Sequence, residues 1–166
     1  DNATFTNAQN ASIYLGRDAN DLSLDATLPG GSSPSAGIMT KSASEVINNG
    51  LITLGVGVRN AAGILIGNAT GNVLNTGNIV VNGDGRGGNI KNYGITVRDS
   101  GAENGQIIRN DGKINVNGTN NVGIHVSATK KNALVTTSDS GSIVVDGTGG
   151  VGNRNYAIWA EGGVNG

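Results

Sequence analysis

The sequence lacks cysteine and has little proline, histidine, aromatic side chain or charge. Without cysteine, neither a disulfide nor a thiolate metal site can form. Because the chain has no cysteine and no second histidine, His125 cannot join a Cys–His catalytic group or a zinc site built from nitrogen and sulfur ligands. Aromatic residues are 3% and charged residues 14% of the chain. These values disfavour both a compact core of large side chains and a disordered, strongly charged chain.

Charge and hydropathy also exclude several kinds of partner. The formal net charge is −1, and because no basic cluster occurs we expect no nucleic-acid partner. No run of about 18 apolar residues is present, so we expect no membrane insertion by this segment. The first residues, from Asp1, do not resemble a signal peptide. We therefore interpret the chain as an excerpt of a longer secreted protein.

Glycine, in contrast, is abundant, with 29 of 166 residues, and it recurs within a repeated motif. The clearest copy, residues 74–97, has Asn-x-Gly, then an alternating apolar run, then a glycine-rich stretch and Gly-Ile-x-Val. The Asn-x-Gly glycines and Gly141 are separated by 27, 35 and 29 residues. Periods between about 20 and 50 residues are typical of solenoids. The glycines concerned are Gly50, Gly77, Gly112 and Gly141.

The repeat predicts an all-β protein, a parallel β-helix of about five coils of roughly 26–35 residues. Each coil should contain three short strands, because the apolar residues alternate with period two and show no helical periodicity. A degenerate first copy is expected around Ile13 and Ile38. We treat residues 1–166 as one solenoid segment, with a long loop or insertion at 16–36 that contains both prolines. Further variable loops are expected at 83–92, 98–106 and 146–155.

Stacking in register predicts rows of equivalent side chains along the solenoid. Asparagines before the corner glycines should form an amide ladder, and the glycines should permit close approach or a positive φ. The expected ladder is Asn48, Asn75, Asn110 and Asp139. The expected interior rows are Ile52, Ile79, Ile114 and Ile143; Leu54, Val81, Val116 and Val145; and Ile64, Ile95, Ile124 and Ile158.

Few residues suggest chemistry. Alternation points His125 outward, where we interpret it as a solvent-facing strand residue. The segment 82–88, Asn-Gly-Asp-Gly-Arg-Gly-Gly, is a single imperfect copy of a calcium-binding glycine–aspartate repeat, and tandem copies are missing. We therefore predict no catalytic, cofactor-binding or metal-binding residues and no cofactor.

A polysaccharide-degrading β-helix would need clustered carboxylates on one outer face. The predicted outward rows contain none, although Asp111 and Asp139 lie near successive corners. Trp159 is the one residue that we single out for contact, since an outward indole commonly anchors sugars or proteins. The alternative is that Trp159 packs beneath a neighbouring loop. The outward rows are Thr53, Val80, Asn115 and Val144; and Leu65, Thr96, His125 and Trp159.

The units Asn-x-Gly-x-Ile-x-Val and Gly-Ile-x-Val, over residues 45–160, resemble the passenger regions of bacterial type V secreted proteins, the autotransporter adhesins of Gram-negative bacteria. The resemblance implies a right-handed parallel β-helix displayed at the bacterial surface, held at the outer membrane by regions outside this sequence. It also implies a role in cell adhesion and virulence. The expected partners are host-cell, bacterial or matrix surfaces, either protein or glycan.

These observations predict a non-catalytic, extracellular stalk or scaffold. The alternative is a self-assembling structural protein, built by end-to-end or lateral pairing of solenoids into filaments or a surface layer. A polysaccharide-degrading β-helix is the third possibility. The three differ in what they release or bind: a surface partner, a second copy, or a sugar product.

Overall fold

The computed structural model describes eight stretches of the chain, in which fifteen β-strands and no helix occur. The predicted all-β fold is therefore confirmed. The first sequence copy, expected to be degenerate, forms a full coil of three strands. The described stretches are residues 3–16, 35–40, 45–67, 71–83, 91–98, 107–127, 134–146 and 154–161.

Every third strand belongs to the same sheet, and every strand pair is parallel. Sheet A contains β1 (Thr4–Asn7), β4 (Glu45–Asn48), β7 (Val73–Asn75), β10 (Ile107–Asn110) and β13 (Leu134–Thr137). Sheet B contains β2 (Ser12–Leu15), β5 (Leu51–Leu54), β8 (Asn78–Val81), β11 (Lys113–Val116) and β14 (Ser142–Val145). Sheet C contains β3 (Ser35–Thr40), β6 (Ala61–Gly67), β9 (Asn92–Arg98), β12 (Asn121–Ser127) and β15 (Tyr156–Glu161).

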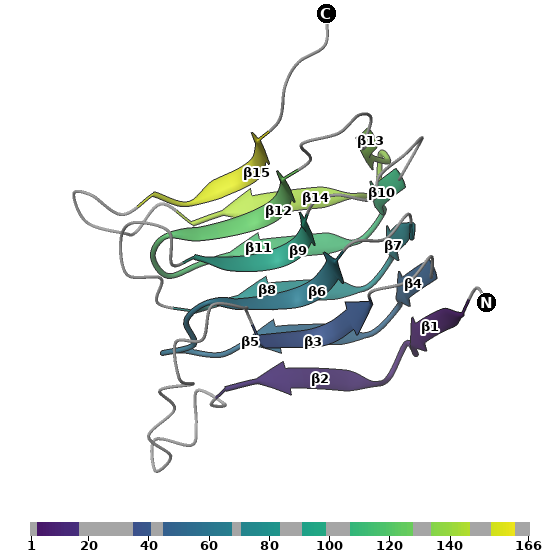
Figure 1. Ribbon diagram of the computed structural model, residues 1–166, viewed down its shortest axis with the longest axis horizontal. Helices are drawn as coiled ribbons and strands as arrows, with labels where there is room; N and C mark the ends of the chain where they lie inside the picture. The colour runs from purple at the N-terminus through teal and green to yellow at the C-terminus, as the bar shows by residue number, and fades with distance from the viewer. Residues whose placement is uncertain are drawn as a thin grey trace, which may run out of the picture.

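Three successive strands make one coil, and five coils stack to form a parallel β-helix. In Figure 1 the coil of β1–β3 lies at one end of the stack and the coil of β13–β15 at the other. Each coil is hydrogen-bonded only to its neighbours, as the strand orders of all three sheets require. Stability in such an array is close to a sum of coil and nearest-neighbour terms.

The core is a set of aliphatic rows that run along the stack. All three predicted interior rows are confirmed by the strand register, and the first coil adds Ile13, Leu15 and Ile38 to them. A fourth row lines sheet A and comprises Phe5, Val46, Val73, Ile108 and Val135. In the middle coils these side chains are fully or almost fully buried. Each contributes roughly 1.5–3 kcal/mol through burial.

In the strands of sheet C, the alternation of inward-facing and outward-facing side chains shifts by one residue, and this shift determines which side chains lie on the outer face. Ala61 and Ile64 belong to the interior cluster, whereas Ala62 and Leu65 belong to a separate outer cluster. Inward and outward positions are therefore displaced by one residue at Gly63. The glycines at 94 and 123 stand opposite this position in the next coils, so the displacement is shared by successive strands.

The corner glycines are needed for close approach between coils, not for a positive φ. A Cβ added at Gly77 would lie 2.1 Å from the carbonyl oxygen of Gly50, the equivalent residue one coil earlier. Positive φ values occur elsewhere, at Asn60 and Asn120 among the non-glycine residues described. Both asparagines lie just before a sheet C strand, where the chain turns out of sheet B.

The predicted loops lie mostly outside the described residues. Residues 17–34 of the predicted insertion are not described, and its last two residues, Ser35 and Ala36, are already part of β3. Likewise, β9 begins at Asn92 and ends at Arg98, so both of these predicted loop positions are strand. The remainder of the glycine-rich calcium-like segment beyond Gly83 falls outside the described residues.

Candidate functional site

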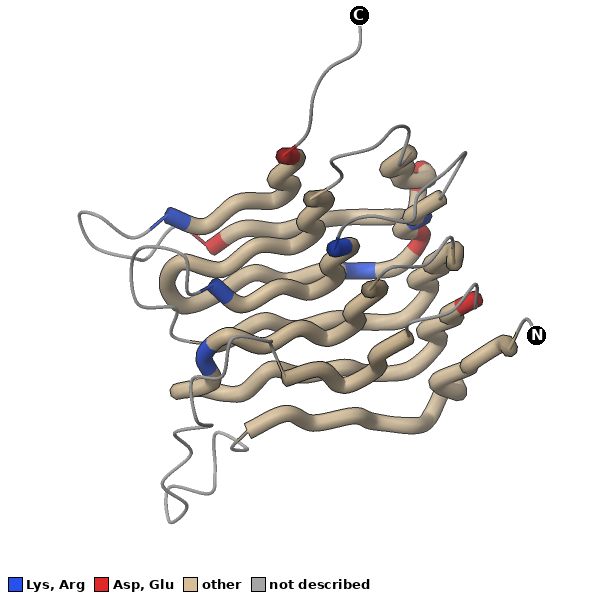
Figure 2. The backbone as a smooth tube through the Cα atoms, in the orientation of Figure 1, with Lys and Arg blue, Asp and Glu red and all other residues tan. Residues whose placement is uncertain are grey.

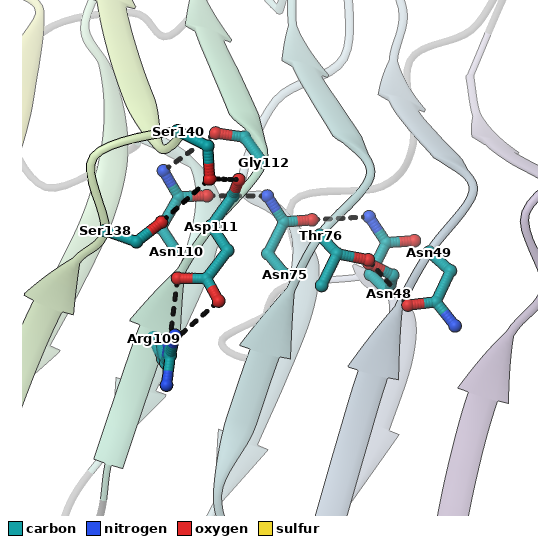
Figure 3. A network of polar contacts seen from close by, with 10 residues as sticks. All are labelled: Asn48, Asn49, Asn75, Thr76, Arg109, Asn110, Asp111, Gly112, Ser138 and Ser140. Atoms are coloured by element: carbon teal, nitrogen blue, oxygen red, sulfur yellow. Dashed lines mark hydrogen bonds and ion pairs between the residues drawn. The ribbon is translucent and has the colours of Figure 1, made fainter.

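An asparagine ladder runs along the corner between sheets A and B (Figure 3). Asn48 Nδ2 donates to Asn75 Oδ1, and Asn75 Nδ2 donates to Asn110 Oδ1, each at 2.7 Å. The ladder begins one coil earlier than predicted, because Asn7 Nδ2 donates to Asn48 Oδ1 at 2.7 Å. Asn48, Asn75 and Asn110 are completely buried, so these amides satisfy one another in the absence of water.

Asp139 is not part of this ladder, and this prediction was wrong. In the fifth coil the residue opposite Asn110 is Thr137, and Asp139 lies in the turn that follows, exposed to solvent. The reason is the length of the corner: two more residues separate Thr137 from Gly141 than separate Asn110 from Gly112. Asn110 Nδ2 instead donates to the carbonyl oxygens of Gly112 and Ser142.

On the solvent side of this corner, polar side chains form hydrogen bonds and an ion pair with one another. Thr76 Oγ1 donates to Asn49 Oδ1 at 2.6 Å, and the Arg109 guanidinium lies 2.8 Å from the Asp111 carboxylate. The hydrogen bond from Arg109 lowers the pKa of Asp111, and the same bond raises the pKa of Arg109. Asp111 is therefore an ionised partner of a permanently charged group, which is unsuited to general acid catalysis at neutral pH.

A second asparagine ladder, which the sequence analysis missed, lies where the chain enters sheet C. Asn92 Nδ2 donates to Asn121 Oδ1 at 3.0 Å, and Asn155 Oδ1 accepts from the Asn121 backbone N–H at 2.9 Å. Asn92 and Asn121 are completely buried. The sequence does contain a signal for it: Asn-x-Gly-Ile occurs at 92–95 and 121–124, and Asn-x-Ala-Ile at 155–158.

The outer face of sheet C brings together the side chains that are most suited to chemistry, a hydroxyl, an imidazole and an indole. The predicted outward row of Leu65, Thr96, His125 and Trp159 is confirmed by the register of β6, β9, β12 and β15. Its burial differs from the prediction, however. His125 is only 4% exposed, and Thr96 is completely buried. The interpretation of His125 as solvent-facing was wrong, because alternation decides which side a residue faces and not whether that side is covered.

His125 is held between aromatic rings and hydroxyl and carboxylate groups. Its ring centroid lies 4.7 Å from that of Tyr93 and 5.0 Å from that of Trp159. Its Nδ1 is 2.9 Å from Thr96 Oγ1. The Nε2 atom has no hydrogen-bond partner, and the Glu161 carboxylate lies 3.7 Å away. Burial lowers the pKa of His125, and Glu161 opposes this shift, so the imidazole is neutral at neutral pH.

Thr96, His125 and Glu161 have the residue types of a nucleophile, base and acid, but the geometry does not support catalysis. The Thr96 hydroxyl is buried beneath its neighbours, so no substrate can reach it. The 3.7 Å separation between His125 and Glu161 exceeds hydrogen-bonding distance. We interpret this group as packing of the outer face. Among the described residues, no cluster of three or more potential metal ligands occurs.

Trp159 takes part in the same cluster. The Lys91 ammonium lies 3.9 Å from the centroid of its ring, and the Tyr156 ring is stacked on it at 5.7 Å. Trp159 is thus outward, as alternation predicted, and is half-buried by contacts within the chain. A cation–π contact of this kind stabilises by about 0.5–2 kcal/mol. The indole face that Lys91 occupies is not open to a ligand.

The outer face of sheet B is partly exposed along all five of its strands. The predicted row of Thr53, Val80, Asn115 and Val144 runs along its centre, and the register of the first coil adds Tyr14 to this row. Tyr14 is 58% and Val144 47% exposed. Lys113 is the one charged residue in the five strands of this sheet. Figure 2 shows that the charges gather mainly at strand ends and corners, which leaves this face nearly neutral.

Comparison with family models, curated proteins and solved structures gave no match to this chain. Within the described stretches, no helix has the length and hydropathy needed to span a membrane.

Proposed function

We propose that this chain is part of an extracellular, cell-surface β-helix that acts as a non-catalytic adhesive stalk or scaffold. The observation that carries the proposal is the stack itself: five coils joined by three parallel sheets and by a buried amide ladder along one corner. Such an arrangement resists bending and presents equivalent outer residues at regular intervals. The surface location rests on the resemblance of the repeats to type V passengers.

The outer face of sheet B is the contact surface that suits this role. Five strands at about 4.8 Å spacing and four residues at about 3.3 Å give a face of roughly 300 Å². This is well below the ≈ 800 Å² per partner of a stable protein complex. We therefore infer weak individual contacts with a protein or glycan surface, strengthened when many copies on one cell engage at once.

The test compares many copies with one. Beads coated with the purified protein are applied to glycan arrays, matrix proteins, host cells and bacteria, and the soluble protein is measured in parallel. We expect saturable bead adhesion to at least one surface and much weaker binding of the soluble protein. Folded protein that adheres to none of these surfaces would contradict the proposal, and release of sugar products would support a degrading enzyme instead.

A matched pair of variants locates the contact. Val144→Lys places a charge on the outer face of sheet B, and Leu134→Lys places one on sheet A of the same coil. Both side chains are exposed, at 47% and 55%, so neither change should disturb the core. We expect Val144→Lys to reduce adhesion and Leu134→Lys to leave it unchanged. Equal effects would show that sheet B is not the contact face.

A further inference from the structure

The two end coils differ from the inner coils at one residue each, at the positions where a neighbouring coil would come closest. In the inner coils both positions are glycine. In the first coil one of them is Ala11, and in the fifth coil the other is Ala157.

The first position is the corner between sheets A and B. The backbone carbonyls of Ala11, Gly50, Gly77 and Gly112 accept equivalent hydrogen bonds from the next coil, which establishes that these residues correspond. A Cβ added at Gly77 would lie 2.1 Å from the Gly50 oxygen, and one at Gly112 would lie 2.1 Å from the Gly77 oxygen. Real Cβ atoms essentially never come within 3.0 Å of such an atom. At this corner, a coil needs glycine wherever another coil precedes it.

The second position is the shift in sheet C, and there the restriction has the opposite direction. A Cβ at Gly94 would lie 2.6 Å from the Gly123 oxygen, and one at Gly123 would lie 2.6 Å from the Ala157 oxygen. Gly37 and Gly63 face the following coil in the same way. Here a coil needs glycine wherever another coil follows it. Ala157 stands opposite Gly123 in the register of β12 and β15.

We propose that the methyl groups of Ala11 and Ala157 prevent a second copy of this chain from stacking end to end in the register of the five coils. If the first coil of one copy were placed on the fifth coil of another, both methyl groups would lie in the same interface. Ala157 would meet the carbonyl of Gly37 in the incoming copy, and the incoming Ala11 would meet that of Gly141.

The end coils otherwise suit such stacking, so these methyl groups decide the outcome. Among the described strands, β1–β3 and β13–β15 are each paired along one edge only, and an unpaired edge normally templates further pairing. Interior side chains are partly uncovered at both ends, with Phe5 44% and Ile158 46% exposed. An aliphatic row at one end would continue into a matching row at the other. The two methyl groups therefore act at edges that are otherwise suited to pairing with a second copy of this chain.

The placement of both methyl groups in one interface gives a specific test. Ala11→Gly alone, or Ala157→Gly alone, leaves one clash in every possible end-to-end contact. An equimolar mixture of the two variants contains one contact without a clash, between the fifth coil of the Ala157→Gly copy and the first coil of the Ala11→Gly copy. The other ends remain blocked. We expect each variant to sediment as a monomer and the mixture to double in mass and stop there.

The double variant should form longer rods in negative-stain electron microscopy, because both of its ends are unblocked. Ala8→Gly and Ala160→Gly are the controls, since each removes a methyl group from the same corner or strand without touching the two positions. Both test variants should fold, since the inner coils have glycine at these sites. End-to-end rods of the unchanged protein would overturn the proposal. So would a monomeric mixture, or control variants that associate equally.

Discussion

Replacing Asn75 with alanine removes the middle of the buried corner ladder and should lower the free energy of unfolding by about 2–6 kcal/mol. The Asn75 amide accepts from Asn48 and donates to Asn110, both at 2.7 Å. Its loss leaves one donor and one acceptor buried without their main partners. Each such group costs about 1–3 kcal/mol, and two of them give the range stated. Proteins are stable by only about 5–15 kcal/mol, so the effect is large.

The assay is equilibrium unfolding in urea, followed by far-UV circular dichroism and by the fluorescence of Trp159. Since Trp159 is the single tryptophan and lies in the fifth coil, the two signals separate global unfolding from loss of the last coil. Asn7→Ala is the comparison, because it removes one ladder bond at the end of the stack and should cost about 1–3 kcal/mol. Thr76→Ala removes an exposed bond and should cost less than either.

The order of these three variants tests the reasoning more sharply than any single value. If Asn75→Ala destabilised no more than Thr76→Ala, the ladder would contribute nothing beyond a surface hydrogen bond. The conclusion that buried amides hold adjacent coils together would then be refuted. An m-value that fell together with the midpoint would instead point to separate unfolding of part of the stack.

Three further predictions concern other parts of the structure. Burial lowers the pKa of His125 below its ordinary value of 6.5, so the contribution of this neutral imidazole to the free energy of unfolding should be full above pH 6.5 and decrease as the pH falls below it. The melting temperature of His125→Gln, measured from neutral to acidic pH, should therefore decrease less than that of the unchanged protein. An equal decrease in both proteins would exclude His125 as its source. Gly94→Ala should lower the free energy of unfolding by about 1–3 kcal/mol through overpacking, because the added Cβ would lie 2.6 Å from the carbonyl oxygen of Gly123. Gly67→Ala is the control, since a Cβ added there would lie 3.8 Å from its nearest neighbour. Equal urea midpoints for the two variants would contradict the predicted clash. Asn120 has φ of 54°, and its Oδ1 accepts a hydrogen bond from the Arg154 backbone N–H at 3.3 Å. Asn120→Ala and Asn120→Gly both lose this bond, but only alanine is strained at positive φ, so Asn120→Ala should be less stable than Asn120→Gly in urea by about 1–2 kcal/mol. Equal stability of the two variants would be the opposite result.

The sequence predicted the rows of the stack well because they depend on local alternation and on a repeated motif. Ile52, Ile79 and Ile114 could be aligned by counting from the preceding glycine, and the structure confirms that alignment. The same counting failed for Asp139, where the corner is longer and the glycine is no longer a fixed distance from the ladder position. Alternation also placed His125 on the correct side of sheet C but gave the wrong burial, because coverage of an outer face is a tertiary property.

The missed ladder of Asn92 and Asn121 shows a different limit. Its motif is present in the sequence, but asparagine next to glycine is equally typical of an exposed turn. What distinguishes the two cases is whether the amide is buried against the next coil, and only the stacked arrangement determines that. A repeated asparagine three residues before an interior isoleucine is a pattern that could identify such ladders in related solenoids.

The corner ladder and the glycine positions both depend on whether a coil has a neighbour on a given side. Every ladder amide donates towards the following coil, from Asn7 through Asn110, and the ladder stops at Thr137. The glycine required by a following coil is likewise replaced in that same fifth coil, at Ala157. These two features lie in different sheets and act through different forces, one polar and one steric. Because both change in the same coil, we conclude that the fifth coil differs from the inner coils in its capacity to accept a neighbour.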